Sequence, residues 1–267
     1  MTARNGTADA PNGLVTRARV ADQVIDDLRE RILTGGLPRG SRLPTERELA
    51  AEFGVSAPTI RESLRALTSL GLVEVRHGSG AYVRTDSEAI LSGPLAMLMQ
   101  LESVSLQEVI GLIQLLNLHA AGLAAQSATD ADIALVYEAA QRTAQCETLE
   151  DAQRGGAAFL VALSDASHQP LLAGLCRFLT NLLVTLETSA YAGRSVSFWR
   201  KWTEDTAPTR LAIANALACR DHPALQAEVT NLHNLVLGRL SPTLRAARLS
   251  DPALAPFVSG LGFDSAR

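Results

Sequence analysis

The sequence predicts a mainly α-helical protein: an N-terminal winged helix-turn-helix with a small β-hairpin wing, followed by an all-α helical bundle. Three helical patterns and then a stretch of period-two alternation come within about 70 residues, which is the element order of a winged helix-turn-helix. The rest of the chain carries one helical pattern after another. Apolar residues make up 47% of the 267 residues and are dominated by alanine and leucine, which favour helices.

The length suggests two domains, and breaker residues divide the chain further. Glycine and proline among small polar residues at the N-terminus are typical of a disordered leader, and Gly93 with Pro94 indicates a break between the domains. We therefore expect a leader at 1–13, a winged helix-turn-helix domain at 14–84, a linker at 85–94, an all-helical domain at 95–248 and a C-terminal tail at 249–267.

Capping and breaker residues delimit the first two helices. The first helical pattern runs from about residue 17 to 33, and a pair of glycines ends it. The second helix begins at Thr45, because Thr45 and Glu48 have the spacing of a capping box, and Gly54 ends it.

The third helix is expected from its N-cap, Ser56, to about Ser69. One face is apolar, and the opposite side carries Pro58, Arg61, Glu62 and Arg65, with Thr59 at its border. Period-two alternation then predicts a β-hairpin whose tip is His77-Gly78-Ser79-Gly80.

In a helix-turn-helix the start of the second helix reaches base edges in the major groove of DNA. Hydroxyl and guanidinium groups can bond to bases or phosphates, and glycine lets the backbone approach closely. Residues 1–86 carry 12 arginines against 11 acidic residues, whereas 87–267 carry 12 basic against 17 acidic residues, which is compatible with a modular DNA binder. The DNA-contact candidates are Arg47, Ser56, Pro58, Thr59, Arg61, Arg65, His77 and Gly78.

The run from Leu37 to Val83 resembles the DNA-binding domain of the GntR-type bacterial repressors. The matching pieces are Gly40 with Leu43-Pro44, Glu46 to Ala50, Val55-Ser56, Arg61-Glu62, Leu64, Gly71-Leu72 and the wing glycines Gly78 and Gly80. The resemblance implies a dimeric repressor that binds a palindromic operator in double-stranded DNA through Arg47, Thr59, Arg61, His77 and Gly78. The family usually has arginine directly after Val-Ser, where this chain has Ala57, so we expect its affinity or half-site preference to differ.

Capping signals predict six or more helices in the second half. Ser105 with Glu108, and Thr129 with Asp132, have the spacing of N-terminal caps. The expected helices cover about 105–127, 129–147, 149–166, 170–191, 206–219 and 223–240, and Pro208 and Pro223 are placed near the first turns of the last two.

This half resembles the ligand-sensing FCD domain of the fatty-acid-regulator branch of the GntR family, over 108–129, 156–172 and 206–233. The resemblance implies that residues 95–248 form a homodimer and bind an effector, either a small organic acid, often held through a metal, or an acyl-CoA. The branch's metal ligands, one Asp and three His, correspond here to Gly156, Leu160, Arg210 and, after a one-residue shift, His233. Gly156 and Leu160 have no donor atoms, so we expect neither a metal nor another cofactor.

Polar residues within the apolar helices are candidates for the effector site: Asn117, Asn181, Thr185, Arg210 and His233. Buried polar groups need partners, which either a ligand or hydrogen bonds between helices would supply. Gly156 and Leu160 make the pocket more apolar than the usual metal ligands would, which indicates a lipid-like or acyl effector, or none. In a pocket, Arg210 would hold a carboxylate or phosphate in place of the metal, and the Leu160 side would accept an apolar chain. The alternative is that Arg210 reaches solvent or forms an ion pair with an acid such as Asp205 or Glu204.

Two other functions stay open. An enzyme or small-molecule carrier is disfavoured, because the sequence shows no nucleophile–base pairing, no paired acids and no phosphate loop. A constitutive DNA binder with a degenerate pocket would differ by showing no effector-dependent release of DNA. The three cysteines are far apart, and no apolar run approaches about 20 residues, so we expect a cytoplasmic protein with no membrane partner.

Overall fold

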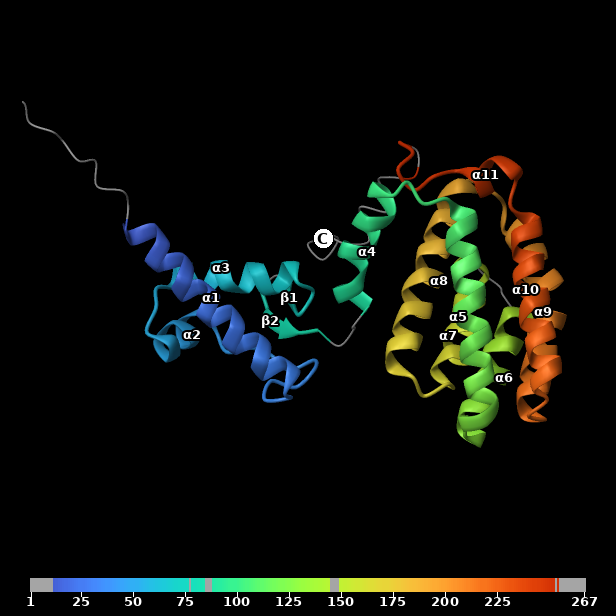
Figure 1. The fold of residues 1–267 in the computed structure, drawn as a ribbon, viewed down its shortest axis with the longest axis horizontal. Helices are drawn as coiled ribbons and strands as arrows, with labels where there is room; N and C mark the ends of the chain where they lie inside the picture. The colour runs from blue at the N-terminus through green and yellow to red at the C-terminus, as the bar shows by residue number, and fades with distance from the viewer. Residues whose placement is uncertain (1–11, 77, 85–87, 145–148, 253, 255–267) are drawn as a thin grey trace, which may run out of the picture. The chain divides into compact units, whose positions relative to one another are not determined.

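The computed structural model describes residues 12–76, 78–84, 88–144, 149–252 and 254. The chain folds into two compact units, and the division between them falls between Ile90 and Leu91. The first unit contains helices and a small sheet, and the second is a helical bundle (Figure 1). The mainly α-helical class predicted from the sequence is confirmed.

The first unit contains α1 (Asn12–Leu33), α2 (Glu46–Phe53) and α3 (Ala57–Ser69). Helix α1 begins within the predicted leader. The expected caps are present: Thr45 and Glu48 form the capping box of α2, and the Ser56 side chain accepts a hydrogen bond from the backbone N–H of Thr59. One buried cluster joins the three helices to the wing: Val24, Leu28, Leu43, Leu49, Ile60, Leu64, Leu67, Leu72, Val73 and Val83.

The wing consists of β1 (Val73–Arg76) and β2 (Gly80–Val83), paired antiparallel with Arg76 opposite Gly80. The segment before α2 lies along the other edge of β2. There the backbone N–H of Gly40 donates to the Val83 carbonyl at 2.9 Å, and that of Leu43 donates to the Ala81 carbonyl at 2.8 Å. These bonds fix the wing against the connector between α1 and α2.

Within its described residues, the second unit is helical. Its elements are α4 (Glu88–Leu101), which begins just before the division, α5 (Leu106–Ser127), α6 (Asp130–Ala144), α7 (Leu149–Asp165), α8 (Pro170–Ala190), α9 (Val196–Ala218), α10 (His222–Arg239) and α11 (Pro242–Ala246). Two buried clusters form its core. One includes Phe159 with residues of α5, α6, α7, α9 and α10, and the other includes Phe178 with residues of α4, α5 and α8.

Three predicted boundaries are wrong. Pro94 lies inside α4 and does not end it, and Pro208 lies inside α9, which begins at Val196 instead of near 206. A proline within a helix removes one backbone hydrogen bond, but both prolines are exposed, so water can solvate the released carbonyl. The predicted tail also begins too early, because Leu249 and Leu254 are buried in the cluster around Phe178.

Arg220 joins the turn between α9 and α10 to the end of α5. Its guanidinium donates to the carbonyl oxygens of Ala124, Ala125 and Ala128 at 3.4, 2.8 and 2.6 Å. Carbonyl groups in the last turn of a helix have no partner within the helix, and a cation there also interacts favourably with the helix dipole. Arg220 therefore stabilises the C-terminal end of α5.

Helices α5 and α8 are long and apolar enough to cross a membrane by length and composition alone. Half of each apolar window is buried inside the bundle. A core helix of a soluble protein has the same character, and here the buried faces of both helices contribute to the cluster around Phe178.

Candidate nucleic-acid interface and effector cavity

The start of α3 presents Pro58, Arg61 and Arg65 on the exposed side of the helix, while Ile60 and Leu64 are buried on the other. The two arginines are four residues apart, so they lie one above the other on one face. Helix α3 therefore exposes the two cations Arg61 and Arg65 on one face and buries its apolar side chains on the other.

Thr59 does not belong to that exposed side. Its side chain is only 3% exposed, and its hydroxyl is 2.8 Å from the Ser56 hydroxyl. The assignment of Thr59 to direct DNA contact is therefore corrected, because its hydroxyl takes part in capping α3. Ser56 itself is exposed at the helix start.

A groove of about 320 Å³ runs between α3, the start of α2 and the wing. Arg61 and Arg65 line it, together with Arg42, which sequence reasoning missed. Arg42 lies in the connector, where no periodicity marks it, and packs over Gly80: a Cβ at Gly80 would lie 3.1 Å from Nε of Arg42. Glu46 is the acidic residue of this groove, and its carboxylate is 3.7 Å from Nε of Arg61.

The remaining candidates lie on α2 and the wing. Arg47 is exposed in the first turn of α2. Gly78 is exposed at the wing tip with a φ of +70°, a conformation that glycine adopts without strain. His77 lies outside the described residues.

The helical domain contains a cavity of about 60 Å³ between α5, α7, α8, α9 and α10. Its walls are mostly apolar and include Leu160, Trp199 and Trp202. The polar side chains that line it are Thr180, Glu187, Arg210 and His233. The two tryptophans also pack against each other, with ring centroids 5.9 Å apart.

The structure brings together Gly156, Leu160, Arg210 and His233, the four positions aligned with the metal ligands. Asn181 and Thr185 do not line the cavity, because α8 faces it with Thr180, Leu183, Val184 and Glu187. The Thr185 hydroxyl instead donates to the Asn181 carbonyl at 2.9 Å, within α8. Sequence reasoning missed Glu187, although it is the sole acidic residue of α8.

Arg210 reaches the cavity because position 156 is glycine. A Cβ on Gly156 would lie 2.8 Å from Nη2 of Arg210, closer than real Cβ contacts allow. The arginine is 4% exposed, so it is fully inside the domain. The alternative ion pair of Arg210 with Asp205 or Glu204 is wrong, because Asp205 pairs with Arg239 at 2.6 Å and Glu204 is exposed.

Burial perturbs both charged groups of the cavity. Burial raises the pKa of Glu187 to about 8, although the positive charges of Arg210 and Arg239 oppose this shift. Burial lowers the pKa of Arg210 to about 10, in the same direction as repulsion from Arg239. At neutral pH the cavity therefore contains a guanidinium cation and a mostly protonated carboxyl group.

His233 has both ring nitrogens engaged. Nδ1 lies 2.9 Å from the Val229 carbonyl and must donate to it, so the neutral ring leaves Nε2 as an acceptor for the Asn117 amide at 3.3 Å. Burial lowers the pKa of His233, which keeps the ring neutral. The side-chain amide of Asn117 therefore donates a hydrogen bond to His233.

Two family models match the chain in the order of its two units. The model described as bacterial regulatory proteins, gntR family, matches residues 20–83, and that of the FCD domain matches residues 108–234. The chain belongs to the GntR family. It is a transcriptional regulator with a DNA-binding helix-turn-helix and an FCD effector-binding domain, and not an enzyme.

Known relatives of this GntR-family regulator are also described as regulatory proteins. The chain is 29% identical over 213 residues to the HTH-type transcriptional regulator LutR of Bacillus subtilis, and the alignment covers 78% of this chain and 96% of LutR. The chain is 32% identical over 166 residues to the putative L-lactate dehydrogenase operon regulatory protein of Escherichia coli. That alignment covers 60% of this chain and 63% of the relative. The fold resembles that of Streptococcus agalactiae GntR, with a TM-score of 0.61 at 22% sequence identity. The match covers 82% of this chain and 100% of the solved structure. The fatty-acid branch stays a prediction.

The residues that line the cavity of this GntR-family regulator do not fit the metal site of the fatty-acid-regulator branch that the second half resembles. Gly156 and Leu160 offer no donor atoms, Arg210 is a cation, and the His233 nitrogens are engaged. Across the described residues, no group of three or more His, Cys, Asp or Glu side chains could hold a metal ion. Arg210 supplies a positive charge to this cavity instead.

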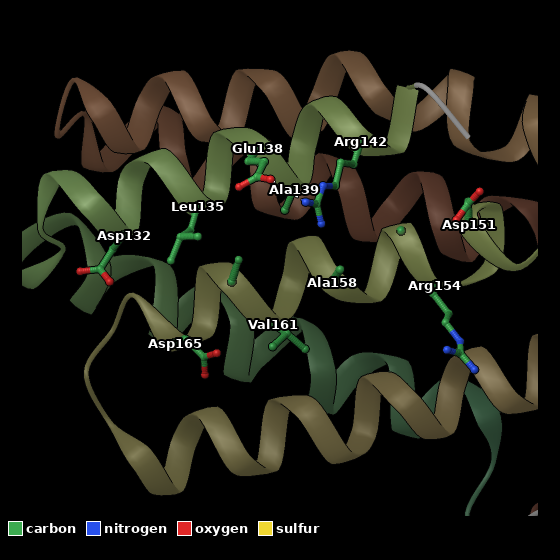
Figure 2. A pocket seen from close by; sticks show the side chains of 12 residues that line it. Asp132, Leu135, Glu138, Ala139, Arg142, Asp151, Arg154, Ala158, Val161 and Asp165 are labelled. Atoms are coloured by element: carbon green, nitrogen blue, oxygen red, sulfur yellow. Dashed lines mark hydrogen bonds and ion pairs between the residues drawn. The ribbon is translucent and has the colours of Figure 1, made fainter. Parts of the chain in front are cut away.

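A wider groove of about 600 Å³ lies outside the core, between α6 and α7 of this GntR-family regulator. Figure 2 shows its charged rim, and several of those side chains already have partners. Arg142 pairs with Glu138 at 2.6 Å, and Asp165 pairs with Arg177 at 2.8 Å. The interior cavity is therefore the stronger candidate for the effector site.

Proposed function

We propose that this regulator is a repressor in the cytoplasm that binds a palindromic operator as a homodimer and responds to a small organic acid in its helical domain. The observation that carries the DNA-binding part is the exposed side of α3, where Arg61 and Arg65 line one groove with the wing. The start of such a helix reads base edges in the major groove. Arg47, Ser56, Pro58 and Gly78 complete the proposed interface, together with His77.

The Arg61→Ala variant is expected to weaken specific operator binding by about 1–3 kcal/mol, if Arg61 contacts a base. The exposed ion pair with Glu46 offers little competition, since the two groups are 3.7 Å apart and solvated. Titrating the operator and a scrambled duplex with the full-length variant measures this effect. Unchanged operator affinity would contradict the groove assignment of α3.

Two variants serve as controls for this experiment. Arg47→Ala should weaken binding to all duplexes similarly. It should also reduce the slope of log binding constant against log salt concentration by about one, as expected for the loss of one phosphate contact. Ala57→Arg restores the residue usual in the family and should tighten binding while steepening the salt dependence.

Dimer formation is supported by exposed leucines on α5. Leu112 and Leu115 are 43% and 63% exposed and lie one turn apart. Light scattering of the full-length protein is expected to give twice the mass of one chain, and Leu115→Glu is expected to halve it. Leu171→Glu, at an exposed site on α8, is the matched control. A monomeric unsubstituted protein would refute the dimer.

The small volume of the cavity favours an organic acid over an acyl-CoA as effector. Pockets that bind drug-sized ligands typically have about 300–1,000 Å³, whereas this cavity has about 60 Å³. Arg210 supplies the positive charge that a carboxylate requires. Effector-dependent release of operator DNA distinguishes this function from constitutive DNA binding.

A further inference from the structure

Four polar side-chain atoms around the cavity have no hydrogen-bond partner: Oγ1 of Thr180, Oε1 of Glu187, and Nε and Nη1 of Arg210. Glu187 is 7% exposed and Arg210 is 4% exposed, so bulk water does not form hydrogen bonds with these atoms. Buried polar atoms are nearly always hydrogen-bonded. Four of them around one cavity, donors and acceptors together, point to a ligand with polar atoms of its own.

We propose that the cavity binds a short-chain monocarboxylate between Arg210 and Glu187, and that the carboxylate binds only while Glu187 is protonated. This inference rests on the proposed effector function and deepens it. The ligand's carboxylate accepts hydrogen bonds from the free N–H groups of Arg210. The protonated Glu187 carboxyl and the Thr180 hydroxyl act as further donors.

The volume of the cavity limits the length of the chain. A buried water needs about 10–15 Å³ of accessible space, so the cavity of about 60 Å³ holds about four to six water-sized groups. A carboxylate with one to three further carbons fits that space. The apolar walls, which include Leu160, Trp199 and Trp202, favour a hydrocarbon chain over a polar one.

The charges around Glu187 explain the link to a proton. From α9 it faces Arg210, and from α10 it faces Arg239 and the neutral His233, whereas the cavity-lining residues of α5 and α7 are uncharged. Arg239 is paired with Asp205 at 2.6 Å. An ionised Glu187 would neutralise Arg210, and a bound anion would then leave the buried site negatively charged, which is unfavourable. Anion binding therefore requires Glu187 to be neutral.

The two tryptophans of the chain, Trp199 and Trp202, both line the cavity and report on ligand binding. Full-length protein is titrated with acetate, propionate, butyrate and hexanoate between pH 6 and 9 at constant ionic strength, with sodium chloride as the reference salt. Saturable fluorescence changes are expected for the first three and weaker binding for hexanoate. Because Glu187 has a pKa of about 8, the dissociation constant of butyrate should rise about tenfold per pH unit above pH 8.

Three variants test the roles of the two charged residues. Glu187→Gln keeps a neutral donor, so it should bind butyrate at pH 7 and lose the pH dependence up to pH 9. Arg210→Met should abolish binding, and Glu204→Gln, an exposed site on α9, should behave like the unsubstituted protein. Circular dichroism checks that each variant is folded. If Arg210→Met does not fold, the pH profile of Glu187→Gln still tests the proposal.

Two outcomes would overturn the inference: no saturable binding of any of the four acids, or a pH dependence that persists in Glu187→Gln. Operator binding measured on the same samples separates this result from the proposed function. A protein that binds its operator but no carboxylate refutes the ligand assignment alone.

Discussion

Phe159→Ala is expected to lower the free energy of unfolding of the helical domain by about 3–5 kcal/mol. Phe159 is 0% exposed and lies in a cluster in which eight of the sixteen buried residues are alanines. Alanine has no rotamers with which to fill the space left by a phenyl ring, so the cavity would persist. Urea denaturation followed by tryptophan fluorescence measures the loss, because both tryptophans lie in this domain.

The control for Phe159→Ala is Leu171→Ala on α8, whose side chain is 72% exposed. A surface substitution of this kind changes stability by about 0.5 kcal/mol or less. A loss below about 1 kcal/mol for Phe159→Ala would contradict the proposed core, because buried phenylalanines rarely give so small an effect.

Stability is expected to fall by about 2 kcal/mol as the pH rises from 6.5 to 8, because of Glu187. The pKa of its carboxyl is raised from the usual 4.5 to about 8 by burial in the folded protein, so unfolding releases a proton over this range. Higher pH therefore favours the unfolded state until the folded pKa is passed. His233, whose pKa is lowered by burial, acts with the opposite sign, but its effect is largest below pH 6.5.

The measurement is urea denaturation in steps of pH without added carboxylates. Glu187→Gln should flatten the profile above pH 6.5, and Glu204→Gln should leave its slope intact. The same slope in Glu187→Gln as in the unsubstituted protein would show that another group is responsible.

Local signals account for the elements that the sequence predicted well. The capping pairs Thr45 with Glu48 and Ser105 with Glu108 mark helix starts correctly, because a cap depends only on residues within one turn. The start of α9 was missed because Pro208 resembles a first-turn proline, whereas tertiary packing extends this helix back to Val196.

Site residues were harder to predict, because they depend on which face of each helix turns inward. On α8, the polar residues Asn181 and Thr185 were predicted to face the pocket, but the inward face carries Thr180 and Glu187. A lone acidic residue in a long apolar helix is the signal that would have identified Glu187. Arg210 was found because a cation stood at an expected ligand position.

The hydrogen bonds of Arg220 have a mechanical consequence for the helical domain. Together with the bond from Asn117 to His233, they hold α5, α9 and α10 as one frame, while the ion pair of Asp165 with Arg177 joins α7 and α8 as a hairpin. The cavity lies between frame and hairpin, with Arg210 on the former and Glu187 on the latter. A ligand bound there would contact α9 through Arg210 and α8 through Glu187, so it would link the two groups of helices to each other.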